Sequence, residues 1–198
     1  YKRQQDDITN VIKECRAKTV GEISGAVVGN EEIIKLLGAA KRAGVKVNGH
    51  CPSMGFRDVQ QAACAGLCDD HECESISDLE QRLACGMAVL VREGTIEPNC
   101  RTLCEGIVKN HIPTDDIMFC TDDKSAEDIK ENGCIDNALR IAVKCGISPV
   151  SAIKMATLNA ARHYGVDDII GSVAPSRKAN FLLMDSLENM TVKKVYHQ

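Results

Sequence analysis

Short apolar runs alternate with longer amphipathic stretches along most of the chain. One amphipathic stretch extends from Asn30, a residue type that caps helices, to Gly44, which is typical of the position just past a helix end. Its apolar residues recur every three or four positions, which predicts a helix. A short strand at Val45–Val47 follows, and the order repeats with a helix around Val59–Ala65 and a strand at Leu67–Cys68. Helices that alternate with such short strands predict β/α units and a parallel sheet.

The same pattern continues downstream and then changes. The box Ser77–Glu80 predicts a helix that runs toward Met87, and Ser148 caps a long helix predicted over Pro149–His163. From Gly171 onward, short β-like stretches separated by turns indicate the start of a small β domain, with a boundary near 166–170. The other predicted elements are a helix at Ile8–Arg16, strands at Lys18–Val20 and Ile117–Cys120, a strand with its polar junction at Val89–Thr95, and β-like stretches at Ser172–Pro175, Ala179–Met184 and Thr191–Tyr196.

Four of the predicted strands end in side chains that can bind a metal ion: Glu22, His50, His71 and Asp122, in chain order. In a (β/α)₈ barrel, the carboxyl ends of the strands form the face that carries the active site. Imidazole and carboxylate groups suit zinc, iron or manganese. Any one of these residues alone would be read as a cap or turn residue. The four together favour a metal site.

Composition and charge exclude several classes of function. The chain has 198 residues, 24 of them basic and 28 acidic, so it lacks the surplus of cations that phosphate-backbone binders use. It has six aromatic side chains and no tryptophan, which argues against base-stacking surfaces. No apolar run approaches the roughly 20 residues that span a bilayer, and the polar start shows no signal peptide. We therefore expect a cytoplasmic protein without nucleic-acid or membrane partners.

The eleven cysteines are odd in number, no export signal is visible, and the chain is too long to depend on disulfide staples. The pairs Cys64/Cys68 and Cys100/Cys104 have the spacing of one helix face. No pair has the C-x-x-C spacing of zinc or redox motifs. We expect reduced thiols that serve mostly as small apolar core residues. The alternative is a thiol-based metal or redox protein that uses Cys64, Cys68, Cys73, Cys100 and Cys104.

A set of motifs in a fixed order carries a resemblance to a known family. The chain resembles the adenine deaminases of the amidohydrolase superfamily from about Glu22 to Met184. Each motif is moderately specific, and their order strengthens the match. The motifs are Val47–Pro52, Asp70–Glu72, Gly86–Met87 with Arg92–Thr95, Thr121–Asp123, the helix Ala152–Ala161, and Gly171–Pro175.

The resemblance implies metal-dependent hydrolysis of adenine to hypoxanthine and ammonia. It implies a divalent ion, manganese or iron first and zinc as a further option, because a bound ion makes hydroxide available near neutral pH. Glu22, as a bridging carboxylate, would hold the metal with His50, His71 and Asp122. Asp122 would also move the proton, with Glu72 as a second catalytic carboxylate. Arg92, Glu93 and Asp123 would bind the substrate. For Glu72, Arg92, Glu93 and Asp123, solvated or salt-bridged structural roles remain open.

The sequence also departs from the family. It has no His-x-His motif, which family members carry after their first strand, and Ser176 and Asn180 replace a usual glycine and aspartate. A full barrel takes about 250 residues. We therefore expect α/β architecture: the C-terminal part of a TIM-like (β/α)₈ barrel over 1–168, then the start of a small β-sandwich domain over 169–198. The chain would be part of a longer polypeptide, a homo-oligomer that completes a barrel, or an inactive relative. The alternative function is a catalytically incomplete fragment that acts as a metal-binding or assembly module.

Overall fold

The computed structural model describes residues 9–10, 12 and 14–198, and the helix predicted at Ile8–Arg16 falls partly outside these residues. The described chain consists of two compact units. The first comprises the residues up to Glu72 together with Glu80–Val89, and the second comprises Cys73–Leu79 and Leu90–Gln198. Within the described part of the chain, no helix is both long enough and apolar enough to cross a membrane.

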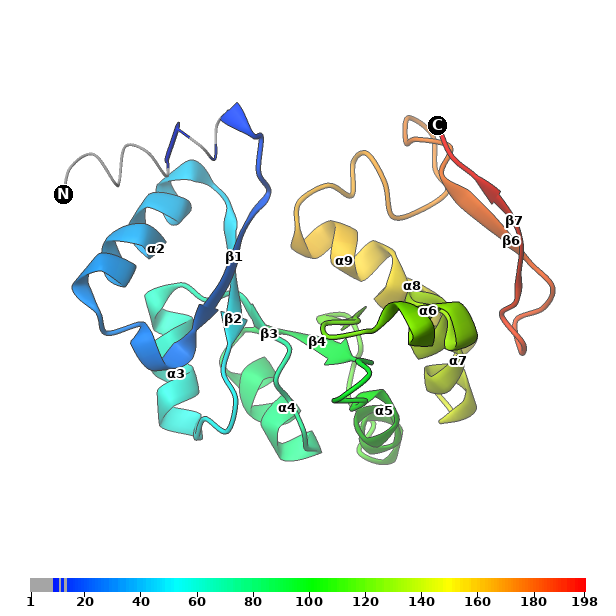
Figure 1. The fold of residues 1–198 in the computed structure, drawn as a ribbon, viewed down its shortest axis with the longest axis horizontal. Coiled ribbons are helices and arrows are strands. Elements are labelled where there is room, and N and C mark those ends of the chain that lie inside the picture. Colours follow the sequence, from blue (N-terminus) through cyan, green and yellow to red (C-terminus); the bar gives the residue numbers. More distant parts are fainter. Residues whose placement is uncertain (1–8, 11, 13) are drawn as a thin grey trace. The chain divides into compact units, whose positions relative to one another are not determined.

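The first unit is built from parallel strands and the helices between them (Figure 1). Its core contains side chains from both layers, among them Leu37, Val47, Val59 and Met87. The elements in chain order are β1 (Thr19–Ser24), a 3₁₀ turn (Gly25–Val27), α2 (Glu31–Ala43), β2 (Lys46–His50), α3 (Phe56–Ala65), β3 (Asp69–Asp70), most of α4 (Ile76–Ala84) and the start of β4 (Ala88–Arg92).

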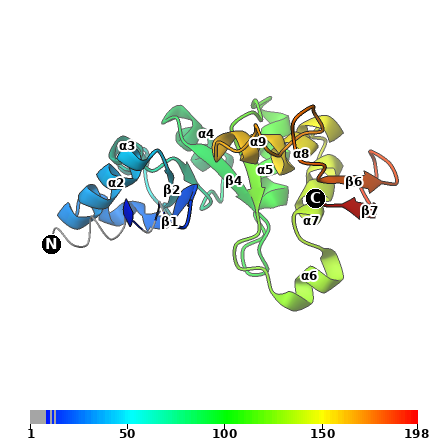
Figure 2. The same ribbon diagram turned by 90° about the horizontal axis from the view of Figure 1, so that it is seen from above.

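The second unit contains the end of β4 and all later elements. Its last two strands form a separate antiparallel hairpin, in which the rings of Phe181 and Tyr196 stack with centroids 4.5 Å apart (Figures 1 and 2). The elements are α5 (Cys100–Lys109), β5 (Ile117–Cys120), α6 (Ala126–Asn132), α7 (Ile135–Lys144), α8 (Pro149–Ala156), α9 (Leu158–His163), β6 (Phe181–Met184) and β7 (Val192–Tyr196).

The strands β1 to β5 form one sheet in chain order, as expected for β/α units. The pairs β1–β2, β2–β3 and β3–β4 are parallel. In the described residues the order runs from β1 at one edge to β5 at the other, so the sheet is not closed into a barrel. The prediction of alternating helices and parallel strands is confirmed. The predicted division at residue 168 stays a prediction.

Local signals explain where α2 begins and ends. The Asn30 side chain accepts a hydrogen bond of 2.9 Å from the backbone N–H of Glu32, which satisfies one of the free donors of the first turn. Gly44 ends the helix in the left-handed region, at φ 70°, where a glycine has no Cβ to clash. Both predicted boundaries of this helix are confirmed, and so is the strand at Ile117–Cys120.

Three predicted elements are wrong in position. The strand expected at Leu67–Cys68 lies at Asp69–Asp70 instead, because these two acidic residues supply the pairing with β2. The strand expected to end at Val20 continues to Ser24. The capping box uses Ser75 rather than Ser77: Ser75 Oγ accepts from the Asp78 N–H, and the Asp78 carboxylate accepts from the Ser75 N–H.

Two further predictions also need correction. The helix predicted over Pro149–His163 is broken at Thr157, whose φ of −137° is not helical. The Thr157 hydroxyl donates to the Ile153 carbonyl at 2.6 Å, the kind of side-chain to backbone bond that competes with a helix. Ser148 does cap the first part, α8. The β-like stretch expected at Ser172–Pro175 is not a strand.

All eleven cysteines are free thiols. Cys100 and Cys104 are buried on α5 with their sulfur atoms 3.8 Å apart, whereas Cys68 lies beyond the end of α3 and therefore does not share a helix with Cys64. The hydrogen bond with the Cys104 thiol, together with burial, raises the pKa of Cys100, so its thiol stays neutral. Among the described residues, the groups that could share a metal ion include no cysteine. Cys51, Cys73, Cys100 and Cys104 are buried packing residues, whereas Cys15 and Cys64 are exposed, so the expectation holds for only part of the thiols.

Candidate metal centre

A bulge in β1 sets the position of Glu22. Val20 pairs with Val47 and Ile23 pairs with Gly49, so the two residues Gly21 and Glu22 lie opposite one residue of β2. Such an insertion locally kinks and twists the strand and re-aims its side chains, and bulges are frequent beside functional sites. Glu22 is therefore a residue within β1 and not, as predicted, one that follows the strand.

The two histidines lie at the carboxyl ends of the next two strands. His50 is the last residue of β2, and His71 directly follows the short strand β3. Because β2 and β3 are parallel and adjacent, their ends bring the two rings together, with centroids 5.4 Å apart. Glu72 comes next in the chain, and its carboxylate faces the same two rings.

The four side chains converge on His71. Its Nε2 lies 3.4 Å from Nδ1 of His50, 3.4 Å from Oε2 of Glu22 and 3.3 Å from Oε1 of Glu72. The Glu72 Oε1 atom is also 3.4 Å from Nδ1 of His50. We call Glu22, His50, His71 and Glu72 the donor cluster. The ligand atoms of Glu22, His50 and His71 all lie within 4.8 Å of one another, as a shared metal ion requires.

The thiol next to His50 is not a ready ligand. Cys51 is fully buried, and burial together with the nearby Asp70 carboxylate raises the pKa of its thiol to about 12. A neutral thiol is a weak metal ligand, because the thiolate is the binding form. The donor cluster is therefore composed of imidazole and carboxylate groups alone.

Residues of the second unit form a group of their own around Arg92. This side chain is buried, and its Nη1 donates to Oδ2 of Asp122 at 3.2 Å. It also pairs with Glu97. Asp122 lies two residues past β5 with φ 50°, a left-handed backbone that turns the chain sharply at this point. The predicted substrate residue Arg92 thus contacts the predicted metal ligand Asp122.

Glu93 and Asp123 occupy the same region of the second unit. The Glu93 backbone N–H donates to the Cys120 carbonyl at 3.0 Å. Burial raises the pKa of the Glu93 carboxyl, although the positive charge of Lys124 acts to lower it. Asp123 Oδ2 accepts from the Ile96 N–H at 2.7 Å. Gly94 is required here, because its missing Cβ leaves the space that the Asp123 carboxylate occupies.

The predicted site residues therefore fall into two groups. The first unit brings together Glu22, His50, His71 and Glu72. The second unit brings together Arg92 and Asp122, which are next in the chain to Glu93 and Asp123. Sequence reasoning missed Glu97, and it missed the buried ion pair between Asp70 and Arg82, at 2.9 Å. Arg82 carried a signal: it lies one helical turn after Leu79 on the apolar face of α4, where a charge needs a partner.

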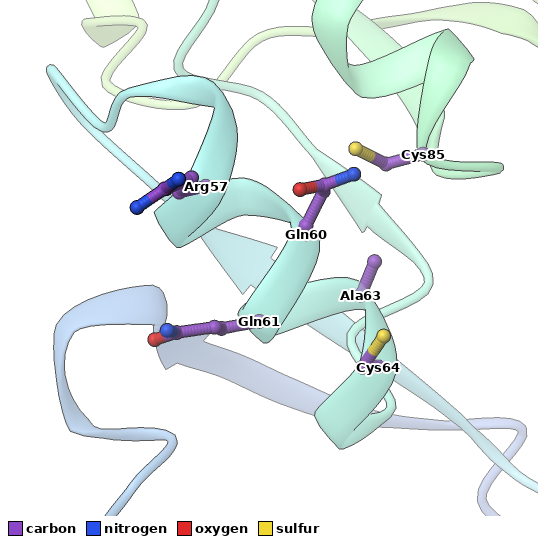
Figure 3. Close-up of a pocket in the computed structure, with 6 residues that line it drawn as sticks. All are labelled: Arg57, Gln60, Gln61, Ala63, Cys64 and Cys85. Atoms are coloured by element: carbon purple, nitrogen blue, oxygen red, sulfur yellow. The ribbon is translucent and has the colours of Figure 1, made fainter.

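A groove of about 670 Å³ lies on α3 (Figure 3). Exposed Arg57 stands at its rim, and the groove shares no residue with the donor cluster. Its lining is mixed amide, thiol and apolar, without any of the histidines or carboxylates that a metal site needs. The lining residues are Arg57, Gln60, Gln61, Ala63, Cys64 and Cys85.

Comparison with known proteins decides the family. The family model described as "Amidohydrolase family" matches residues 8–198. The chain belongs to the amidohydrolase family.

Curated relatives of this amidohydrolase carry the name adenine deaminase. That of Nitratidesulfovibrio vulgaris is 38% identical over 192 residues, which are 96% of this chain and 33% of the relative. That of Kosmotoga olearia is 36% identical over 194 residues, again 96% of this chain and 33% of the relative. The resemblance to adenine deaminases is confirmed. The chain spans about one third of the length of the curated relatives it matches.

Solved structures confirm the fold of this amidohydrolase. N-acetylglucosamine-6-phosphate deacetylase from Pasteurella multocida superposes with a TM-score of 0.73 at 13% identity, over 97% of this chain and 58% of that one. The corresponding enzyme of Mycobacterium smegmatis gives 0.71 at 15% identity, over 98% and 57%. The predicted class, a partial α/β TIM-like domain, is therefore correct.

Proposed function

We propose that the protein containing this chain hydrolyses adenine to hypoxanthine and ammonia, and that this chain supplies part of the catalytic domain. The observation that carries the proposal is the donor cluster, in which two imidazoles and two carboxylates from neighbouring strands converge. The relatives named adenine deaminase, at 36–38% identity across 96% of the chain, support the choice of substrate.

The spacing of the donor cluster fits a divalent metal ion. Two ligand atoms held about 2.1 Å from one ion at the tetrahedral angle are about 3.4 Å apart, and the His50–His71 and His71–Glu22 donor atoms are each 3.4 Å apart. Glu22, His50 and His71 would hold the ion, with Asp122 as the fourth predicted ligand. Imidazole and carboxylate ligands admit manganese, iron or zinc, and the resemblance to adenine deaminases favours manganese or iron. When bound, such an ion acts as a Lewis acid that makes hydroxide available near neutral pH.

Other side chains of this chain transfer the proton and orient the reacting groups. Asp122 accepts the proton of the attacking water and passes it to the leaving amine, so that adenine and water give hypoxanthine and ammonia. Arg92, which donates to Asp122 Oδ2, orients this carboxylate. Glu72 orients the two imidazoles and provides a second carboxylate for proton transfer. Arg92, Glu93 and Asp123 belong to the face that receives the purine ring.

The biological setting that we propose is purine salvage in the cytoplasm. The ligand of the site is a small purine base, and the proposal involves neither a nucleic acid nor a membrane. Because the chain spans about one third of its curated relatives, the active form is a longer polypeptide or an assembly of several copies.

The test is adenine turnover, followed by the change in purine absorbance after loading with Mn(II). The chain is assayed alone and fused to the part of the N. vulgaris adenine deaminase that lies outside the match. Turnover by either form supports the proposal, and turnover by the fusion alone identifies this chain as an incomplete part of the site. Absence of turnover in both forms, with the intact relative active in parallel, would contradict the proposal.

One observation favours a second function. The sequence contains no His-x-His motif, so the chain by itself lacks a ligand pair that the family carries. The second candidate is therefore a metal-binding or assembly module without turnover. It predicts that the chain and the fusion both bind Mn(II) by calorimetry, and that neither converts adenine.

A further inference from the structure

A buried carboxylate connects the two strand ends that carry the histidines. Asp70 is the last residue of β3 and is fully buried. Its Oδ1 atom accepts hydrogen bonds from two backbone N–H groups, that of Cys51 at 3.0 Å and that of Glu72 at 3.2 Å. These are the residues that directly follow His50 and His71. One oxygen atom thus ties together the backbone just past both histidines.

Arg82 of α4 fixes this carboxylate from the other side. Its Nε donates to Asp70 Oδ2 at 2.9 Å, and its Nη2 donates to the Cys51 carbonyl at 2.7 Å. Cys51 is therefore held at its N–H by Asp70 and at its carbonyl by Arg82. Both charged side chains are at least 99% buried, with 0% of Asp70 and 1% of Arg82 exposed.

Stability alone is a weak reason for such a pair. Moving a charged side chain from water into a protein interior costs on the order of several kcal/mol per ion. A protein in which a buried ion pair is replaced by well-packed apolar side chains is therefore often as stable or more stable. A buried hydrogen-bonded network does fix one arrangement of the groups that it touches. Here those groups are the backbone segments that carry His50 and His71.

We infer that Asp70 and Arg82 are positioning residues, which hold the His50 and His71 rings at the spacing that a shared ligand needs. The inference rests on the proposed function for the identity of that ligand, a divalent metal ion. The spacing itself is a property of the metal-free chain and can be measured there. Neither residue contacts the ligand: Asp70 acts through the backbone of Cys51 and Glu72, and Arg82 acts through Asp70 and the Cys51 carbonyl.

The main variant is the double substitution Asp70→Asn with Arg82→Met. It removes both charges together, so no buried charge loses its partner, and it leaves an amide oxygen for the two N–H groups. Arg82→Lys is the conservative variant, which keeps the charge but cannot reproduce both donor contacts of the guanidinium. Arg57→Met, at an exposed arginine of α3, is the matched control.

Two readouts are used on the full chain. The first is binding of Co(II), by calorimetry and by its visible spectrum. The second is the nuclear Overhauser effect between the His50 and His71 rings in the metal-free protein. Circular dichroism and urea unfolding check that each variant folds.

In the double variant we expect Co(II) affinity to fall about 10- to 100-fold, as for other partners of metal ligands, and the cross-ring signal to weaken. Arg82→Lys should show a smaller loss of both, and Arg57→Met none. Wild-type affinity and an unchanged cross-ring signal in a folded double variant would overturn the inference. If the double variant does not fold, the same two measurements are made on Arg82→Lys, and wild-type affinity with an unchanged cross-ring signal in that variant would overturn the inference. Failure of the wild-type chain to bind Co(II) would contradict the metal centre, while the metal-free ring signal still decides the positioning role.

Discussion

At the scale of single residues, the donor cluster depends most on His71. Its Nε2 atom lies within 3.4 Å of donor atoms from three other side chains, and its own side chain is only 11% exposed. The Glu72 carboxylate beside it is also buried, and a metal ion held here would compensate its charge. His71 is therefore the position at which substitution separates metal binding from folding.

Replacing His71 by alanine should abolish Mn(II) binding. The loss should be at least about 100-fold in affinity, because even partners of metal ligands cost about 10- to 100-fold. Isothermal titration of the folded chain measures it, and His197→Ala, at an exposed histidine near the C-terminus, is the control. Retained Mn(II) affinity in His71→Ala would remove this residue from the ligand set.

Glu93 gives a prediction that depends on pH. Burial raises the pKa of its carboxyl above 4.5, so the folded state binds the proton more tightly than the unfolded state. Its contribution to stability is fully present below the unfolded pKa and is lost as the pH rises through the higher folded pKa. Glu93→Gln should therefore raise the free energy of unfolding at pH 7, by an amount that shrinks as the pH falls toward 4.5.

Urea unfolding at several pH values checks this expectation. Glu188→Gln, at an exposed glutamate of the second unit, should leave the free energy of unfolding unchanged at every pH. A Glu93→Gln variant that is less stable than the wild type at pH 7 would show that the Glu93 charge is instead compensated in the fold, by Lys124, whose Nζ donates to the Glu93 carbonyl at 3.3 Å.

At the scale of elements, local chemistry predicts boundaries where one residue satisfies a backbone group. Asn30 and Gly44 bound α2 as expected, because an N-cap and a left-handed glycine act within one helical turn. The break at Thr157 was not predictable from periodicity. The apolar pattern continues across it, and the competing hydrogen bond to Ile153 is visible only in the structure.

The cap of α2 can be tested directly. Asn30→Ala removes the side-chain acceptor for the Glu32 N–H and should lower the free energy of unfolding by about 1 kcal/mol. Asn30→Ser keeps an acceptor and should retain most of that stability. Denaturant titration compares the three proteins. Equal stability of the alanine and asparagine forms would mean that water satisfies the first turn equally well.

The candidate site was also predictable only where local sequence signals determine it. His50 is the last residue of β2 and His71 directly follows β3, so a strand-end rule finds them. The bulge at Gly21–Glu22 and the pair Asp70–Arg82 depend on the register between strands and on contacts across a dozen residues or more. The sequence indicates these contacts only weakly, through the charge of Arg82 on an apolar helix face.

At the scale of the whole molecule, the sheet ends at β1 on one side and at β5 on the other within the described residues. Unpaired strand edges recruit further strands. We therefore expect the chain to associate, and light scattering after size exclusion under reducing conditions should give a multiple of 21.5 kDa. A stable species at 21.5 kDa would contradict completion of the sheet by further copies, and would favour a longer polypeptide.

The donor cluster is unevenly open to solvent. Glu22 is 57% exposed and His50 35%, whereas His71 and Glu72 are 11% and 7% exposed. If these residues hold a metal ion, as proposed, an ion arriving from solution would meet the Glu22 carboxylate first and reach His71 last. An ion leaving the site reverses that order, so a chelator competes first for the contact with Glu22. In the proposed metal site, the most exposed ligand would therefore govern how long a bound ion stays.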